Sequence, residues 1–175
     1  MINKRVEAAV NEQIKREEHS SRLYLAMASW CEVSGFPGAA AFLYAQADEE
    51  RMHMLKFVHY LNDRNGHALM AALDMPAPEY KSLHDVFEQV MKHEEYITAS
   101  INELYGISFE EKDFTTANFL QWFINEQIEE ESTMRGILDK LNLAGEGKSG
   151  GLFHIDKDLA GMAAARATTT GTTAE

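Results

Sequence analysis

Acidic, amide and imidazole side chains interrupt the apolar seams of four helix-like segments, each near the middle of its segment. Apolar residues recur there at alternating steps of four and three, which is typical of helices that pack in a bundle. The polar residues on these seams are Glu17, Glu50 with His53, Glu94, and Gln127 with Glu130. Burying several carboxylates together is unfavourable, because ionised groups lose hydration and like charges repel. A bound cation reverses that balance, so the pattern predicts a metal site between the helices.

The spacing of these residues repeats along the chain. Glu17 and Glu50 are 33 positions apart, and so are Glu94 and Gln127. The repeat indicates two helical hairpins that each supply half of one site. Carboxylates with one imidazole and no thiolate favour iron or manganese over structural zinc, and bridging glutamates suit two ions a few ångströms apart. We predict iron.

A second interpretation remains open at this point. The register of each seam was chosen to pass through the polar residues, and residues 113–142 offer another apolar face through Phe119, Trp122 and Ile128. Rotated helices would turn the carboxylates towards solvent or into ion pairs, and no metal would bind.

Four long helices are predicted to carry the site, which makes the fold all-α. They cover about residues 2–34, 37–65, 82–106 and 113–142, and Pro37 opens the second of them. Gly106 is expected to end the third helix as a left-handed cap.

The connection between the second and third helices, at about residues 67–81, is long for a helical bundle. When extended, it can span the length of the second helix and return to the starting end. We therefore expect two helical hairpins joined by a crossover, although an up-down-up-down path also fits.

Composition limits the remaining possibilities. The chain has 175 residues, 45% of them hydrophobic, and a formal net charge of -12. We expect one domain over residues 1–165, including a short amphipathic helix at about 153–162, and a disordered, Thr-rich tail at 166–175. The charge argues against nucleic-acid binding. Neither a signal peptide nor a membrane span is predicted, and the single Cys31 suits a reducing cytoplasm.

With Tyr24 added, the seam residues resemble the ferroxidase centre of bacterial non-haem ferritins. Five further stretches resemble that family, and the similarity extends from near the start of the chain to about residue 160. They are residues 38–43 (GAAAFL), 92–94 (KHE), 118–122 (NFLQW), 126–131 (EQIEEE) and 139–145 (DKLNLAG). The resemblance implies a ferritin-like four-helix bundle whose short fifth helix lines the four-fold axes of an octahedral shell of 24 subunits. It also implies oxidation of Fe(II) by O2 or H2O2 and storage of Fe(III) as a hydrated oxide mineral.

The resemblance assigns roles residue by residue. Glu17, Glu50 and His53 would hold one iron, and Glu50 would bridge to a second. Glu94 and Glu130 would hold that second iron, with Gln127 nearby and Tyr24 beside them. An additional third iron site would use Glu49, Glu126 and Glu129, with Glu130 shared. Residues 126, 129 and 130 do share a helix face, but an ordinary acidic surface would show the same spacing.

Departures from neighbouring families narrow the subtype. Bacterioferritins carry a second Glu-x-x-His and a haem-ligating Met directly after the bridging Glu. Here the fourth segment reads Gln127-x-x-Glu130, and Arg51 follows Glu50. Haem is therefore not expected. Two rivals remain: a non-storage di-metal peroxidase or oxidase of the ferritin-like family, and a helical bundle without catalytic activity.

Overall fold

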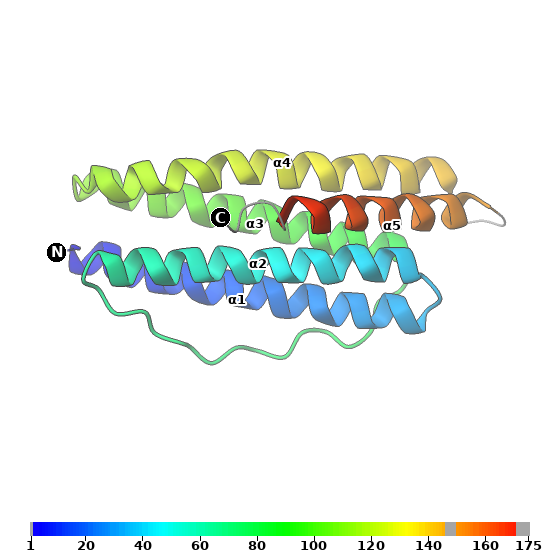
Figure 1. Cartoon of the computed structure of the whole chain (residues 1–175), viewed down its shortest axis with the longest axis horizontal. Helices are drawn as coiled ribbons and strands as arrows, with labels where there is room; N and C mark the ends of the chain where they lie inside the picture. Colours follow the sequence, from blue (N-terminus) through cyan, green and yellow to red (C-terminus); the bar gives the residue numbers. More distant parts are fainter. Residues whose placement is uncertain (1, 146–149, 171–175) are drawn as a thin grey trace.

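Five helices account for nearly all of the regular structure in the computed structural model, which describes residues 2–145 and 150–170 (Figure 1). The helices are α1 (Lys4–Val33), α2 (Pro37–Asp63), α3 (Leu83–Glu110), α4 (Phe114–Ala144) and α5 (Gly151–Thr170). No strand occurs in the described ranges, so the predicted all-α class is confirmed. None of the described helices is long and apolar enough to cross a membrane.

The long connection is a crossover. α1 and α2 form one antiparallel hairpin and α3 and α4 form another, while residues 64–82 run the length of the bundle beside α1 (Figure 1). α2 and α3 therefore point in the same direction, and the up-down-up-down alternative is wrong. Asn11 on α1 fixes the start of the crossover, donating to the His67 carbonyl at 3.0 Å and accepting from the Leu69 amide at 2.7 Å.

Local capping sets where most of the helices begin. The side chains of Asn3, Ser82 and Asp113 accept hydrogen bonds from the first-turn amides of α1, α3 and α4. These contacts satisfy donors that have no partner within the helix. α2 starts at Pro37 as predicted, and the amides of Gly38 and Ala39 in its first turn donate to the Asp156 carboxylate of α5.

The predicted end of α3 at Gly106 is wrong. α3 continues to Glu110, and Lys112, with φ of 55°, takes the left-handed conformation in the turn to α4. A single glycine inside a helix costs only about 1 kcal/mol. Burial of Leu104 and Ser108 continues the seam past that position, so packing outweighs the local preference.

α5 lies along the bundle against α2 and α4 (Figure 1). It is longer than the piece expected at residues 153–162 and extends into the stretch expected as a tail from residue 166. Ile155, Leu159 and Ala163 recur at steps of four and are buried in the core. These contacts stabilise a helix that its own sequence would support poorly. Residues 171–175, the rest of the expected tail, lie outside the described residues.

The polar seam residues lie between two apolar clusters. One cluster contains Ile14 of α1 and Phe57 of α2, and the other contains Tyr24 of α1 and Phe42 of α2. Glu17 lies between Ile14 and Tyr24, so it falls in the layer that separates the clusters. Buried there are Gln13, Glu17, Ser20, Gln46, Glu50, His53, Glu94, Ser100, Gln127 and Glu130.

Candidate metal centre

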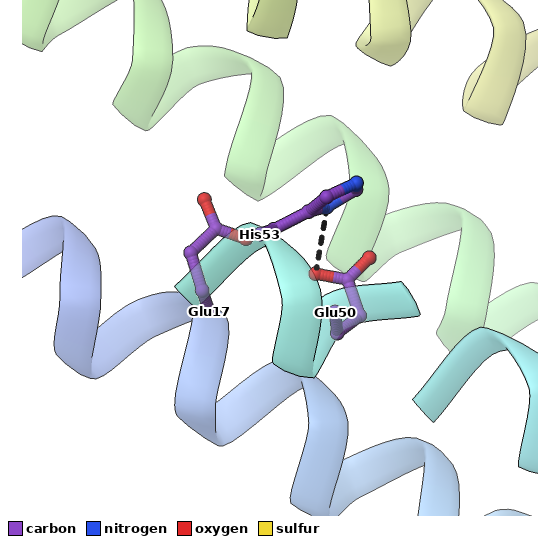
Figure 2. Close-up of side chains that lie close together, drawn as sticks. All are labelled: Glu17, Glu50 and His53. Atoms are coloured by element: carbon purple, nitrogen blue, oxygen red, sulfur yellow. Dashed lines mark ion pairs between the residues drawn. The ribbon is translucent and has the colours of Figure 1, made fainter. Parts of the chain in front are cut away.

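Glu17, Glu50 and His53 meet between α1 and α2. Each offers one ligand atom, and these three atoms lie within 4.8 Å of one another. Glu50 and His53 are one turn apart on α2, and Glu17 approaches them from α1 (Figure 2). His53 Nδ1 lies 3.6 Å from Glu50 Oε2. The three-residue spacing of Glu50 and His53 therefore places both side chains on one face of α2, and this face meets Glu17 of α1.

Water has almost no access to this group. The exposed fractions of Glu17, Glu50 and His53 are 1%, 2% and 4%. One carboxylate oxygen of Glu17 and one of Glu50 have no hydrogen-bond partner among the described residues. Buried acceptors are rarely left without a partner. These two oxygens, beside an imidazole, are therefore suited to hold a cation.

Burial also changes the protonation of the acids. It raises the pKa of Glu17 to about 8, with the nearby Glu50 carboxylate contributing in the same direction. The pKa of Glu50 is raised well above its usual value, mainly by burial and then by Glu94. Near neutral pH without metal, the centre thus holds protons that a divalent cation would displace.

Glu94 enters the same polar layer from α3 and is held by two neighbours. Tyr24 donates a hydrogen bond to Glu94 Oε1, and Gln127 Nε2 donates to Oε2 at 3.0 Å. Burial raises the Glu94 pKa to about 7, and the charge of Glu130 adds to the rise. Each oxygen accepts one hydrogen bond in this arrangement and keeps a second lone pair, so Glu94 could bind a metal without losing either donor.

Glu130 on α4 is likewise buried, and both of its carboxylate oxygens accept hydrogen bonds. Gln46 Nε2 donates to its Oε2 at 2.9 Å, and both terminal nitrogens of Arg166 lie 3.4 Å from its Oε1. Glu94 and Glu130 raise the pKa of Glu50 through their charge. The structure thus gathers the predicted acids of all four helices in one layer, with the tight three-residue group at its α1 and α2 side.

The residues predicted to form a third iron site do not all come together. Glu49, His53 and Glu126 offer ligand atoms within 4.8 Å of one another. Burial raises the pKa of Glu49 and of Glu126. Glu129 instead lies exposed on α4, outside the metal-type groups found among the described residues.

Several residues that hold the site were given no role by the sequence argument. Gln13 Nε2 donates to Glu17 Oε1 at 2.7 Å, and Ser100 Oγ donates to Gln13 Oε1 at 2.9 Å. Gln13 and Gln46 each precede a site glutamate by four positions and lie on the seam, which is a readable signal. Arg166 carried no signal, because its position depends on how α5 docks.

This arrangement can hold cations and support their oxidation. Anionic oxygen ligands stabilise a higher metal charge, and two ions side by side can deliver electrons to one oxidant. Aromatic rings shield the group on one side: the His53 ring packs edge-on against Trp122 and Phe123, with centroids at 5.3 and 5.8 Å.

Comparison with known proteins places this geometry in a family. The family model described as a ferritin-like domain matches residues 7–144. The chain belongs to the ferritin family. A Haemophilus influenzae relative named probable bacterial non-heme ferritin-like protein is 50% identical, covering 93% of this chain and 98% of its own. A Campylobacter jejuni bacterial non-heme ferritin is 43% identical, covering 95% of this chain and 99% of its own.

Solved ferritins share the fold. The open-pore ferritin of Archaeoglobus fulgidus superposes with a TM-score of 0.89 at 39% identity, over 91% of this chain and 98% of that one. The ferritin-like bundle that the family resemblance implied is therefore confirmed, together with its crossover and its C-terminal fifth helix.

Proposed function

We propose that this chain is an iron-storage ferritin that oxidises Fe(II) at a centre within each subunit and retains the product as ferric mineral. The observation that carries the proposal is the buried Glu17, Glu50 and His53 group, in which two carboxylate oxygens have no hydrogen-bond partner among the described residues. The family supports the same function, because its named relatives include bacterial non-heme ferritins.

In this proposal each residue has a defined role in binding the two iron ions. Glu17 and His53 hold one iron, and Glu50 bridges to a second. Glu94 and Glu130 hold the second iron. O2 or H2O2 accepts the electrons, and the carboxylates favour the ferric product because they add negative charge around it.

Two neighbours position these ligands. Gln127 and Tyr24 orient Glu94, and the Tyr24 hydroxyl keeps a proton because burial raises its pKa well above the usual value. Metal binding releases the protons that Glu17 and Glu94 hold in the metal-free state.

Storage requires an enclosed space, and we propose an octahedral shell of 24 copies in the cytoplasm. The net charge of -12 per chain can concentrate cations along acidic walls and pores. Large apolar side chains are exposed on the single chain, which fits association with further copies. The most exposed are Val33, Met75, Ile128, Leu143 and Phe153.

The decisive experiment follows aerobic Fe(II) oxidation by the wild type, Glu50→Ala and His53→Ala. We expect both variants to lose most of the protein-dependent rate. Two matched controls are His59→Ala, an exposed histidine six positions further along α2, and Glu103→Ala, an exposed acid on α3. These should oxidise iron like the wild type. Equal rates in all five proteins would refute a ferroxidase centre at this site.

A non-storage di-metal oxidase is separated from a ferritin by what happens to the iron. After aerobic loading, a ferritin should elute from size exclusion as a large shell carrying far more iron than its ligands could chelate. A monomer or dimer that oxidises iron but retains none would favour the oxidase.

A further inference from the structure

Arg166 brings a positive charge from α5 into the acidic edge of the centre. Its guanidinium is hydrogen-bonded to Glu49 Oε2, and both terminal nitrogens lie 3.4 Å from Glu130 Oε1. These two glutamates come from α2 and α4, so one side chain links three helices. The arginine and Glu49 side chains keep 25% and 23% of their exposure, whereas that of Glu130 keeps only 3%.

The docking of α5 determines where this arginine lies. Ile155, Leu159 and Ala163 form the buried seam of α5. Position 166 follows Ala163 by three residues and continues the same face. The guanidinium carbon also lies 5.4 Å from the centre of the Phe42 ring, within the range of a cation-π contact. The side chain is thus held between an aromatic ring and two carboxylates.

The start of α5 is fixed by a separate contact. The Asp156 carboxylate accepts hydrogen bonds from the amides of Gly38 and Ala39 at 3.0 and 2.8 Å. A bound carboxylate at the first turn of α2 is favoured by the unpaired amides and by the helix dipole. With Asp156 in its second turn and its buried seam both docked, α5 has little freedom to move Arg166 away from the acids.

A cation at this edge would have to share its ligands with the arginine. Glu49 also belongs to the group that it forms with His53 and Glu126. Arg166 occupies Glu49 Oε2 and lies beside Glu130 Oε1, and its fixed charge repels a divalent ion nearby. The arginine therefore meets part of the charge requirement that a third metal would otherwise meet.

We propose that Arg166 is an internal cation that closes the site formed by Glu49, Glu126 and Glu130, so that each chain binds two metal ions instead of three. This inference rests on the proposed ferroxidase centre and concerns how many ions that centre takes. A third ion binds only if α5 withdraws the guanidinium.

The test is an anaerobic titration of the assembled, metal-free protein with Co²⁺, with bound metal counted per chain by equilibrium dialysis. We expect two Co²⁺ in the wild type and three in Arg166→Gln. Arg166→Lys keeps the charge and should stay at two. Lys157→Gln removes an exposed charge from the same helix and should also stay at two. Three Co²⁺ in the wild type, or the same number in wild type and Arg166→Gln, would overturn the proposal.

Glu49→Gln tests the same inference without changing any residue of α5. If Arg166 already closes the site, Glu49→Gln in the wild type keeps two Co²⁺, and in the Arg166→Gln background it returns three to two. A fall caused by Glu49→Gln alone would show an open third site and contradict the inference. Circular dichroism and size exclusion check that each variant folds and assembles.

Failure of this inference is distinguishable from failure of the proposed function. If the wild type oxidises Fe(II) but binds three Co²⁺, only the role inferred for Arg166 is refuted. If the wild type neither binds Co²⁺ nor oxidises iron, the proposed ferroxidase centre itself is refuted.

Discussion

Tyr24 on α1 donates a hydrogen bond to Glu94 on α3, which is 70 positions away in the chain. The hydroxyl therefore couples one hairpin of the bundle to a carboxylate of the other. The bond lowers the pKa of Glu94, opposing the larger rise caused by burial. Tyr24 thus favours the ionised carboxylate that would hold iron.

Removing this hydroxyl should weaken metal binding. In Tyr24→Phe, the pKa of Glu94 rises above about 7, so the rising limb of the pH profile for Fe(II) oxidation moves to higher pH. A hydrogen bond to a charged group is worth about 1.5–3 kcal/mol, so affinity for Co²⁺ should fall about tenfold or more. Tyr44→Phe is the matched control, because Tyr44 donates to the exposed Glu32 at 2.8 Å. Identical pH profiles in the wild type and Tyr24→Phe would contradict the coupling.

The metal-free protein should lose stability as the pH rises. Glu17 has a pKa of about 8 in the folded state, above the value of 4.5 expected when it is unfolded. The folded state therefore binds more protons across this window. The stabilising contribution is complete below about pH 4.5 and is lost as the pH rises through about 8.

Thermal unfolding in the presence of a chelator checks this dependence. The wild-type Tm should fall between pH 5 and pH 8, and Glu17→Gln should flatten the fall because the amide does not titrate. Glu103→Gln, an exposed acid on α3, should keep the wild-type slope. A Tm that rises with pH over this range would show that Glu17 is not held protonated.

Gln13 should matter for metal binding even though it is no ligand in the proposal. Gln13→Leu removes the amide that donates to Glu17, and it also removes the amide oxygen that accepts from the Ser100 hydroxyl. We expect a loss of about 1 kcal/mol or more, or roughly five- to tenfold in Co²⁺ affinity. Ser100→Ala should cost less, because its loss leaves Gln13 bonded to Glu17. Gln121→Leu, an exposed position on α4, is the control. Unchanged affinity in Gln13→Leu would remove its positioning role.

Close packing at Gly38 should make α5 docking sensitive to one methyl group. A Cβ atom there would lie 1.8 Å from the Asp156 carbonyl oxygen, so Gly38→Ala must push α5 away. We expect a lower Tm and faster amide exchange in α5. Asp156→Ala should cost about 1 kcal/mol through loss of the helix cap.

Gly136→Ala is the matched control on α4, because nothing lies within 4 Å of its added methyl group. It should be neutral or slightly stabilising, since alanine is the better helix former. Equal exchange rates for α5 in Gly38→Ala and Gly136→Ala would argue against the tight docking.

Local patterns predicted much of this fold because their physical causes are local. Apolar spacing and Pro37 indicated four long helices, and the length of the connection at residues 67–81 favoured a crossover. The error at Gly106 has the opposite cause. There a local helix-ending preference was outweighed by burial of Leu104 and Ser108, which depends on the other helices.

The sequence by itself determined which side chains share a helix face, because helical periodicity places Glu17, Glu50 and His53 on the apolar seams of their helices. Only the tertiary structure decided how these groups are paired. The Tyr24 bond to Glu94 and the Arg166 contacts with Glu49 and Glu130 join residues that are 70, 117 and 36 positions apart. Such contacts depend on how whole helices pack and dock, which the spacing of residues within one helix does not encode.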